Sequence, residues 1–288
     1  MKLALGTVQF GLDYGIANQR GQVSQDEARS ILDHAKAHGI GTLDTAINYG
    51  NSEQRLGEIG VIGWQVISKL PALPDQCQDV EAWVRSEVQA SLERLRITSL
   101  RGLLLHRPEQ LLGKHGENIY QALRALKQQG LVEKTGVSIY DPAELDPLAQ
   151  RFQLDIVQAP FNMLDRRLIT SGWMDRLAQM NIELHARSVF LQGLLLMPAA
   201  KRPSKFNRWL PIWQRWEQWL AETGLTPLQA CLRDALAQTG IARVVVGVDS
   251  LVQLKEILLA AEGSLPELPE AVHSNDIDLI NPARWENL

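Results

Sequence analysis

Short apolar runs alternate with amphipathic stretches along almost the whole chain. Each run is bounded by glycine, proline or polar residues and is too short for a helix, which is typical of buried strands. The predicted strands are residues 3–7, 39–44, 65–69, 102–106, 134–138, 156–158, 182–187 and 244–248. Helical patterns fill the segments between them; residues 117–129 place Ile119, Leu123 and Leu126 on one face before Gly130 ends the helix. Eight strand–helix units predict an α/β protein with a closed parallel (β/α)8 barrel, a TIM barrel, rather than a doubly wound sheet.

Three successive predicted strands end in ionisable side chains. Asp44 ends the second strand and Tyr49 follows it in the next loop, while Lys69 and His106 end the third and fourth strands. Each residue alone has an ordinary explanation, such as a cap, a half-buried phenol, a solvated lysine or a satisfied histidine. Their corresponding positions indicate one shared site, because active sites of parallel barrels lie at the carboxyl ends of the strands. A phenol can donate a proton near neutral pH when a nearby cation lowers its pKa.

The motifs around these residues resemble those of the aldo-keto reductase family. Residues 44–53 read Asp-Thr-Ala-x-x-Tyr-Gly-x-Ser-Glu, residues 68–70 read Ser-Lys-Leu and residues 104–108 read Leu-Leu-His-Arg-Pro. Residues 5–11, 136–138 and 157–162 look like further landmarks, so the resemblance covers almost the whole chain. It implies an NAD(P)H-dependent oxidoreductase that reduces an aldehyde, ketone or sugar carbonyl to an alcohol, or catalyses the reverse reaction.

The resemblance also implies the roles of the four residues. Hydride would pass from C4 of a nicotinamide to a carbonyl carbon, and Tyr49 would donate the proton. Lys69, held by Asp44, would lower the pKa of the phenol. His106 would orient the carbonyl oxygen and stabilise its developing charge.

A cofactor site at the barrel mouth follows from the same resemblance. No Gly-x-Gly-x-x-Gly follows the first strand, so a Rossmann site is not supported. Ser138 and Gln158 would bond the nicotinamide carboxamide. Arg187 stands where many members carry an aromatic residue; its guanidinium could stack on the nicotinamide or turn towards the pyrophosphate. The expected cofactor-binding residues are Thr7, Ser138, Gln158, Arg187, Ser188, Phe190, Gly247, Val248, Asp249, Ser250 and Gln253.

The eighth strand departs from the family pattern. Members that prefer NADPH usually place lysine and arginine there for the 2′-phosphate, whereas this chain has Gly247 and Gln253. Asp249 would repel a phosphate and could accept a hydrogen bond from a free ribose hydroxyl. The resemblance implies NADPH as the expected cofactor, and this departure makes NADH the alternative. Ser250 and Gln253 also fit a helix capping box, the role we favour for both.

A tryptophan-rich insertion follows the seventh strand. Trp209, Trp213, Trp216 and Trp219 recur every three or four residues, which predicts one face of a helix packed on the barrel. Lys201, Arg202, Lys205 and Arg208 precede them, and this loop could alternatively cover cofactor phosphates or an anionic substrate. Candidates for a partly apolar wall of the substrate pocket are Trp64, Phe161 and Trp209.

Length, composition and charge fit one barrel domain over residues 1–288. Such barrels typically contain about 250 residues, and 45% of the 288 residues here are hydrophobic, enough for one large core. The net charge of −4, without a lysine or arginine block, predicts no nucleic-acid partner. We expect a monomer, because single-chain barrels of this kind complete their sites without a partner.

The sequence predicts a cytoplasmic protein without a metal site. No apolar run approaches the ~18 residues that span a bilayer, and the apolar residues 3–5 are too few for a signal peptide. Cys77 and Cys231 are far apart, so we interpret them as reduced thiols. No cluster of cysteine and histidine has metal-ligand spacing.

Two other classes of function stay open. The altered eighth strand allows a protein that binds nicotinamide cofactor as a sensor or subunit with little turnover. Lys69 could alternatively form a Schiff base in a barrel lyase or isomerase.

Overall fold

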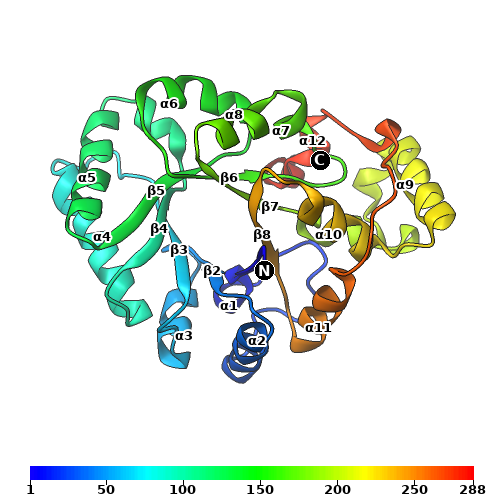
Figure 1. Cartoon of the computed structure of the whole chain (residues 1–288), viewed down its shortest axis with the longest axis horizontal. Helices are drawn as coiled ribbons and strands as arrows, with labels where there is room; N and C mark the ends of the chain where they lie inside the picture. Colours follow the sequence, from blue (N-terminus) through cyan, green and yellow to red (C-terminus); the bar gives the residue numbers. More distant parts are fainter.

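A computed structural model describes all 288 residues and shows a closed barrel of eight parallel strands ringed by helices (Figure 1). The strands are β1 (Leu3–Gly6), β2 (Thr42–Asp44), β3 (Gln65–Leu70), β4 (Leu100–Leu105), β5 (Val132–Ser138), β6 (Ile156–Pro160), β7 (Glu183–Arg187) and β8 (Ile241–Gly247). Each strand pairs with the next, and β8 closes the barrel on β1, with Gly247 opposite Gly6. The predicted (β/α)8 fold and all eight predicted strands are confirmed, although strand ends shift by three residues or fewer.

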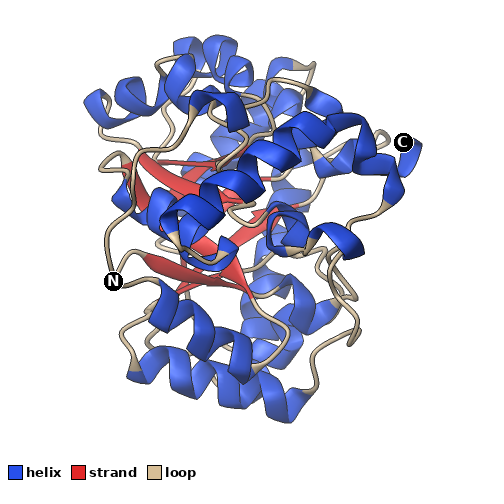
Figure 2. Ribbon diagram, turned by 90° about the vertical axis from the view of Figure 1, so that its right-hand side faces the viewer, coloured by secondary structure: helices blue, strands red, loops and turns tan.

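The helices lie around the strands, which run through the interior of the molecule (Figure 2). They are α1 (Val8–Gly11), α2 (Gln25–Ala37), α3 (Ser52–Ile59), α4 (Val80–Leu95), α5 (Gly116–Gln128), α6 (Leu145–Arg151), α7 (Arg167–Thr170), α8 (Trp173–Gln179), α9 (Leu210–Thr223), α10 (Pro227–Ala237), α11 (Leu251–Ala260) and α12 (Ile277–Ile280). The helix predicted over residues 117–129 is α5, and its predicted apolar face is buried. Gly130 follows it with a φ of 72°, a conformation that favours glycine.

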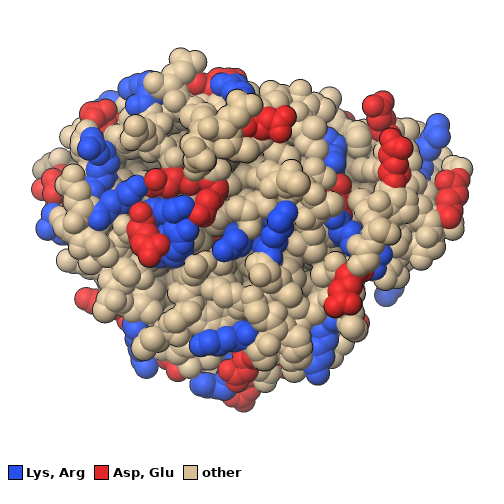
Figure 3. Space-filling view, in the orientation of Figure 1, with Lys and Arg blue, Asp and Glu red and all other residues tan.

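Seven 3-10 helices complete the set. They are η1 (Pro108–Leu112), η2 (Pro142–Glu144), η3 (Leu191–Leu196), η4 (Ala199–Lys201), η5 (Ser204–Trp209), η6 (Glu270–Val272) and η7 (Pro282–Asn287). No helix combines the length and the apolar character that crossing a membrane requires. Acidic and basic side chains are interspersed over the face drawn in Figure 3.

An apolar layer fills the interior of the barrel. Ile67, Leu104 and Ile156 form a cluster of their own, separate from the large core between strands and helices. Gly102 makes room for it, because a Cβ there would lie 2.7 Å from the Ile67 side chain and 2.9 Å from that of Ile156. Packing inside the barrel therefore explains a glycine in the middle of β4.

Polar side chains follow this apolar layer towards the carboxyl ends of the strands. Successive side chains of a strand point to opposite faces, so residues two apart share a face. Lys69 lies two positions after Ile67, and Gln158 two positions after Ile156. His106 is likewise two positions after Leu104. The period of the strands thus brings three polar groups to the barrel mouth, next to the apolar layer of Ile67, Leu104 and Ile156.

The tryptophan-rich insertion forms α9, outside the ring of helices (Figure 1). Trp213, Trp216 and Trp219 are buried along one face, as the spacing predicts. The Trp213 indole N–H donates to the Phe206 carbonyl at 2.9 Å, which satisfies its buried polar end.

Candidate active site

A cavity of about 510 Å³ opens at the carboxyl ends of the strands. All four candidate catalytic residues, Asp44, Tyr49, Lys69 and His106, line it. Loops that follow β1 and β7 form its rim, and residues at the start of α11 line its far end. The structure therefore gathers the predicted strand-end residues in one pocket.

Lys69 and Asp44 form a buried ion pair at the centre of this pocket. Lys69 is 1% exposed, and its ammonium donates to Asp44 Oδ1 at 2.7 Å and to the Thr45 carbonyl at 2.8 Å. The Gln158 amide donates to the other carboxylate oxygen of Asp44 at 2.6 Å. Burial alone would lower the pKa of Lys69, but the charges of Asp44 and Tyr49 outweigh it and raise that pKa above the usual value. Lys69 is thus a fixed cation at neutral pH.

Tyr49 is positioned by a close approach of two loops. A Cβ at Gly11 would lie 1.7 Å from the Tyr49 carbonyl oxygen, and a Cβ at Gly50 would lie 2.4 Å from the Gly11 carbonyl oxygen. Gly50 also has a φ of 53°, which an L side chain adopts only with strain. Both glycines are therefore needed for the turn that carries Tyr49 over the end of β2.

His106 lies beside Tyr49 as a neutral imidazole. The two rings meet edge to face, with centroids 6.0 Å apart, and the Lys69 ammonium lies 5.1 Å from the centroid of the Tyr49 ring. Burial, followed by the positive charges of Lys69 and Arg187, lowers the pKa of His106 to about 4. Its Nδ1 is buried and makes no hydrogen bond. At neutral pH this ring can donate one hydrogen bond without carrying charge.

Residues expected to hold the nicotinamide also line the cavity. Ser138 and Gln158 lie at the ends of β5 and β6, and the Gln158 Oε1 atom is buried without a hydrogen-bond partner. A buried polar atom without a partner is costly, and an amide N–H of a ligand would satisfy it. Thr7 and Phe190 line the same cavity.

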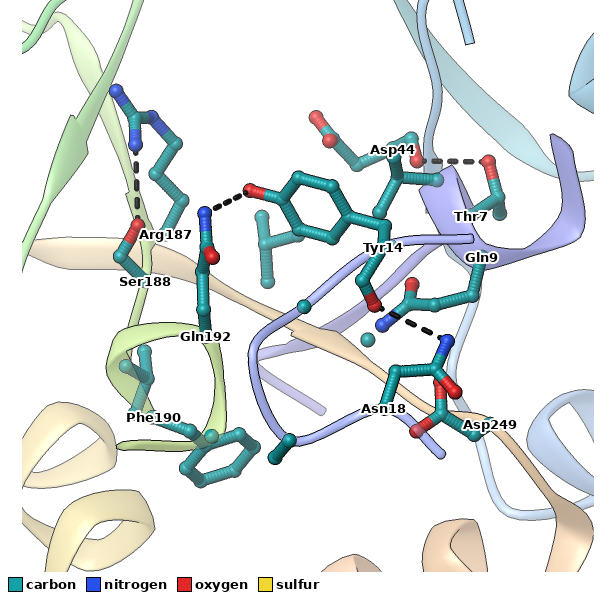
Figure 4. A pocket seen from close by; sticks show the side chains of 18 of the residues that line it. Thr7, Gln9, Tyr14, Asn18, Asp44, Arg187, Ser188, Phe190, Gln192 and Asp249 are labelled. Carbon is teal, nitrogen blue, oxygen red and sulfur yellow. Dashed lines mark hydrogen bonds between the residues drawn. The ribbon is translucent and has the colours of Figure 1, made fainter. Parts of the chain in front are cut away.

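Arg187 is held on the rim of the pocket. Its guanidinium donates to the Ile139 carbonyl at 2.9 Å and to the Ser188 hydroxyl at 3.1 Å (Figure 4). It also lies over the Tyr140 ring, 4.5 Å from the centroid. One face of the guanidinium is therefore already occupied by an aromatic ring of the protein.

The end of β8 contributes only part of its predicted set. Gly247, Asp249 and Gln253 line the cavity, whereas Val248 and Ser250 do not. Val248 is 1% exposed because strand alternation turns it into the core, and Ser250 is 3% exposed at the helix N-terminus. Of the β8-end residues expected to bind cofactor, the structure thus brings Gly247, Asp249 and Gln253 into the cavity wall and leaves Val248 and Ser250 behind it.

Of the capping box predicted for Ser250 and Gln253, the structure contains the Ser250 cap and lacks the bond from Gln253. Ser250 accepts the Gln253 N–H at 3.3 Å and caps α11. The Gln253 side chain accepts the Asp249 N–H at 2.7 Å instead of that of Ser250. The reciprocal bond of a capping box is therefore absent.

Sequence reasoning missed the loops that frame the pocket. Gln9, Tyr14 and Asn18 come from the segment after β1, and Gln192 comes from the segment after β7. The Gln192 amide donates to the Tyr14 hydroxyl at 3.0 Å and bridges the two loops (Figure 4). No local signal marks this contact, because the partners are 178 residues apart.

One expectation and one alternative about the pocket walls are wrong. Phe161 and Trp209 are buried in the large core, Trp64 packs beside it, and none of the three lines the cavity. The basic loop before α9 does not cover the pocket either. Its side chains bind elsewhere: Arg202 to Glu217 at 2.9 Å, Lys205 to the Trp285 carbonyl at 2.5 Å and Arg208 to Asp278 at 2.9 Å.

Comparison with known proteins defines the class. The model of the Aldo/keto reductase family matches residues 2–271, so the chain belongs to this family. It is 26% identical to the uncharacterized oxidoreductase YqkF of Bacillus subtilis (strain 168), with 90% of both chains covered. It is also 25% identical to a D-threo-aldose 1-dehydrogenase of a Pseudomonas species, over 71% of this chain and 73% of the relative. Family and relatives together support carbonyl reductase activity.

The fold agrees with solved structures. The aldo-keto reductase AKR11C1 of Bacillus halodurans, in its holo form, superposes with a TM-score of 0.74 over 96% of this chain and 94% of that protein, at 20% identity. At this identity the likeness shows the shared fold alone.

Proposed function

We propose that the chain is a nicotinamide-dependent oxidoreductase that interconverts a small carbonyl compound and its alcohol, with Tyr49 as the proton donor for reduction. The observation that carries this proposal is the buried Lys69–Asp44 pair, at 2.7 Å, with the Lys69 ammonium 5.1 Å from the centroid of the Tyr49 ring in one cavity. Reduced nicotinamide, when bound, supplies the hydride. The unpartnered Gln158 Oε1 and the neighbouring Ser138 are the groups that would hold its carboxamide.

The residues around Tyr49 prepare the proton transfer. Tyr49 gives its hydroxyl proton to the carbonyl oxygen, which leaves negative charge on the phenol oxygen. Lys69 stabilises that charge, and Asp44 keeps the ammonium in place. Because His106 is neutral, it donates a hydrogen bond to the same carbonyl oxygen without competing as an acid.

A sugar is the first substrate class to test. The rim of the pocket is polar, with Tyr14, Tyr140, Arg187 and Gln192 among its lining residues. Hydroxyl-rich molecules match such a rim, because each polar contact can be satisfied. The relative named D-threo-aldose 1-dehydrogenase points in the same direction.

The alternative classes fit the site less well. A Schiff-base lysine must lose its proton to attack a carbonyl, whereas the charges of Asp44 and Tyr49 outweigh burial and raise the pKa of Lys69. A sensor needs no proton donor, and the assembled Tyr49, Lys69 and His106 would then have no purpose.

A screen of aldoses, aldehydes and ketones with NADH and NADPH tests the proposal. Oxidation of the reduced cofactor should follow addition of a carbonyl substrate. With cofactor deuterated at C4, one deuterium should appear on the new alcohol carbon, as hydride transfer requires. Cofactor binding without deuterium transfer to any substrate would favour the sensor, and borohydride trapping of a substrate on Lys69 would favour the lyase.

A further inference from the structure

The pocket has a second end, at the corner between β8 and α11. Asp249, Gln253 and Glu256 line it there. Figure 4 shows Asp249 with Gln9 and Asn18, on the side of the pocket away from Arg187 and Ser188. We call this region the β8–α11 corner.

The β8–α11 corner has no cation in its lining. Lys69 and Arg187 are the only lysine and arginine that line the cavity, and both belong to the catalytic end. Lys69 is bound to Asp44, and Arg187 is bound to the Ile139 carbonyl. An anionic group placed in the corner would therefore find no positive side chain in the pocket wall.

Two of the amides at the start of α11, those of Leu251 and Gln253, are also engaged. Amides at a helix N-terminus often bind phosphate. Here the Leu251 N–H donates to the Glu27 carboxylate of α2 at 2.6 Å, and the Gln253 N–H donates to the Ser250 hydroxyl. The protein's own carboxylate thus occupies the place where a helix N-terminus would otherwise receive an anion.

Asp249 can bind a hydroxyl group in the corner. Its Oδ1 atom is buried and has no hydrogen-bond partner, so a hydroxyl donor would satisfy it, whereas a phosphate would meet a like charge. Burial raises the pKa of the Asp249 carboxyl above its usual value; the Gln253 side chain and the charge of Arg20, in the exposed loop after β1, oppose this rise, and Asp13 adds to it. Neither Arg20 nor Asp13 lines the cavity.

We propose that the β8–α11 corner selects the dinucleotide whose adenosine ribose has a free 2′-hydroxyl, so that the chain prefers NADH to NADPH. This inference rests on the proposed function, because it requires the nicotinamide to lie at Tyr49 and the adenosine to extend towards α11. It reverses the order of cofactors expected from the sequence alone. Asp249 is the specificity-determining residue, and Glu256 in the cavity wall and Glu27 on the Leu251 amide add further negative charge.

Direct binding tests this proposal. The purified full chain is titrated with NADH and NADPH separately, and quenching of its tryptophan fluorescence is followed. We expect NADH to bind at least about tenfold more tightly, a difference of about 1.4 kcal/mol. Equal affinities, or tighter binding of NADPH, would overturn the cofactor preference and leave the proposed reaction standing. Binding of neither would overturn both.

Charge-removing variants locate the origin of the preference. Asp249→Asn keeps the shape and an acceptor oxygen, so NADPH should bind about tenfold more tightly than to the parent chain while NADH changes less. Glu27→Gln should act in the same direction with a smaller effect. Glu262→Gln, which removes a charge from an exposed position beyond α11, is the control and should change neither affinity.

Arg20 supplies the opposing test. Arg20→Gln should leave the NADH preference intact, since Arg20 is outside the cavity lining. Tight NADPH binding that this substitution abolishes would show that Arg20 receives the 2′-phosphate, and would overturn the proposal.

Discussion

Charged side chains are paired at one end of the pocket and unpaired at the other. At the catalytic end, the Lys69 ammonium and the Asp44 carboxylate lie 2.7 Å apart, and a second bond from Gln158 holds the carboxylate. At the β8–α11 corner, Asp249 keeps a buried oxygen without a partner, and Glu27 bonds a backbone amide. Paired charges fix the position of a reacting group, whereas an unpaired carboxylate is available to discriminate between ligands.

The residues at the two ends of the pocket also belong to different kinds of structure, strands at one end and loops at the other. Asp44, Lys69 and Gln158 are strand residues, held by the barrel ladders on both sides. Asp249 lies after the last residue of β8, and the loops opposite it meet through the Tyr14–Gln192 bond. We therefore expect changes at the catalytic end to reduce chemistry or stability strongly, and changes at the rim to alter binding moderately.

Removing the Tyr49 hydroxyl should reduce catalysis and leave cofactor binding almost unchanged. Tyr49→Phe removes the proton donor, so we expect kcat to fall by about 10³-fold or more, in the range typical of general acids. Cofactor affinity should stay within about twofold, because the cavity keeps its shape. Steady-state kinetics measure kcat, and a fluorescence titration measures the cofactor affinity. Substantial residual turnover would mean that another group donates the proton.

Removing one partner of the buried ion pair should be costly for folding. Lys69→Met leaves Asp44 buried without a counter-charge, so we expect a loss of about 3–5 kcal/mol in the free energy of unfolding. Denaturant unfolding measures it. The double variant with Asp44→Asn is the control and should recover much of the loss. A double variant no more stable than Lys69→Met would show that the pair is not the source of the effect.

The neutral state of His106 gives the catalytic end a pH dependence. Its pKa is about 4 in the folded chain and ~6.5 in the unfolded chain. Between these values the unfolded chain binds more protons, so the free energy of unfolding falls as the pH drops from about 6.5 towards 4. His106→Gln lacks this contribution. The stability of the parent relative to this variant should therefore be lower at pH 4.5 than at pH 7, and an unchanged difference would contradict the low pKa.

Removing the Tyr14–Gln192 hydrogen bond across the rim should have the smallest effect of these changes. Tyr14→Phe removes the bond from Gln192, whose net value is about 0.5–1.5 kcal/mol. We expect release of bound cofactor to accelerate by about 3- to 10-fold, measured by stopped-flow fluorescence, with little change in stability. Tyr120→Phe, which loses a bond to the Gln153 backbone away from the pocket, is the matched control. Equal effects of the two variants would mean that the bridge does not retain cofactor.

The catalytic end could be predicted from the sequence because its residues lie at regular positions in strand–helix units. Asp44, Lys69 and His106 each follow a short apolar run, and the period of two places them on the inner face of the barrel. The same regularity predicts all eight strands. Tyr49 depends on the Gly11 and Gly50 contact, which no period encodes, and the motif alone located it.

The far end could be predicted only in part: the sequence pointed to Gly247, Asp249 and Gln253, but the rest of this end depends on contacts between distant loops. Val248 and Ser250 are adjacent to Asp249 in sequence, yet strand alternation and helix capping turn them away from the pocket. The Glu27 carboxylate reaches α11 from 224 residues away. The basic loop before α9 has the composition of a phosphate site, but acidic and carbonyl groups near the C-terminus bind its side chains.

A crystal structure of the chain with bound NADH would test the central claim most directly. We expect the nicotinamide beside Tyr49 and His106, within hydrogen-bonding reach of Gln158, and a ribose hydroxyl on Asp249. A cofactor bound elsewhere, or with its nicotinamide at the β8–α11 corner, would contradict the proposed reaction and the assignment of both ends of the pocket.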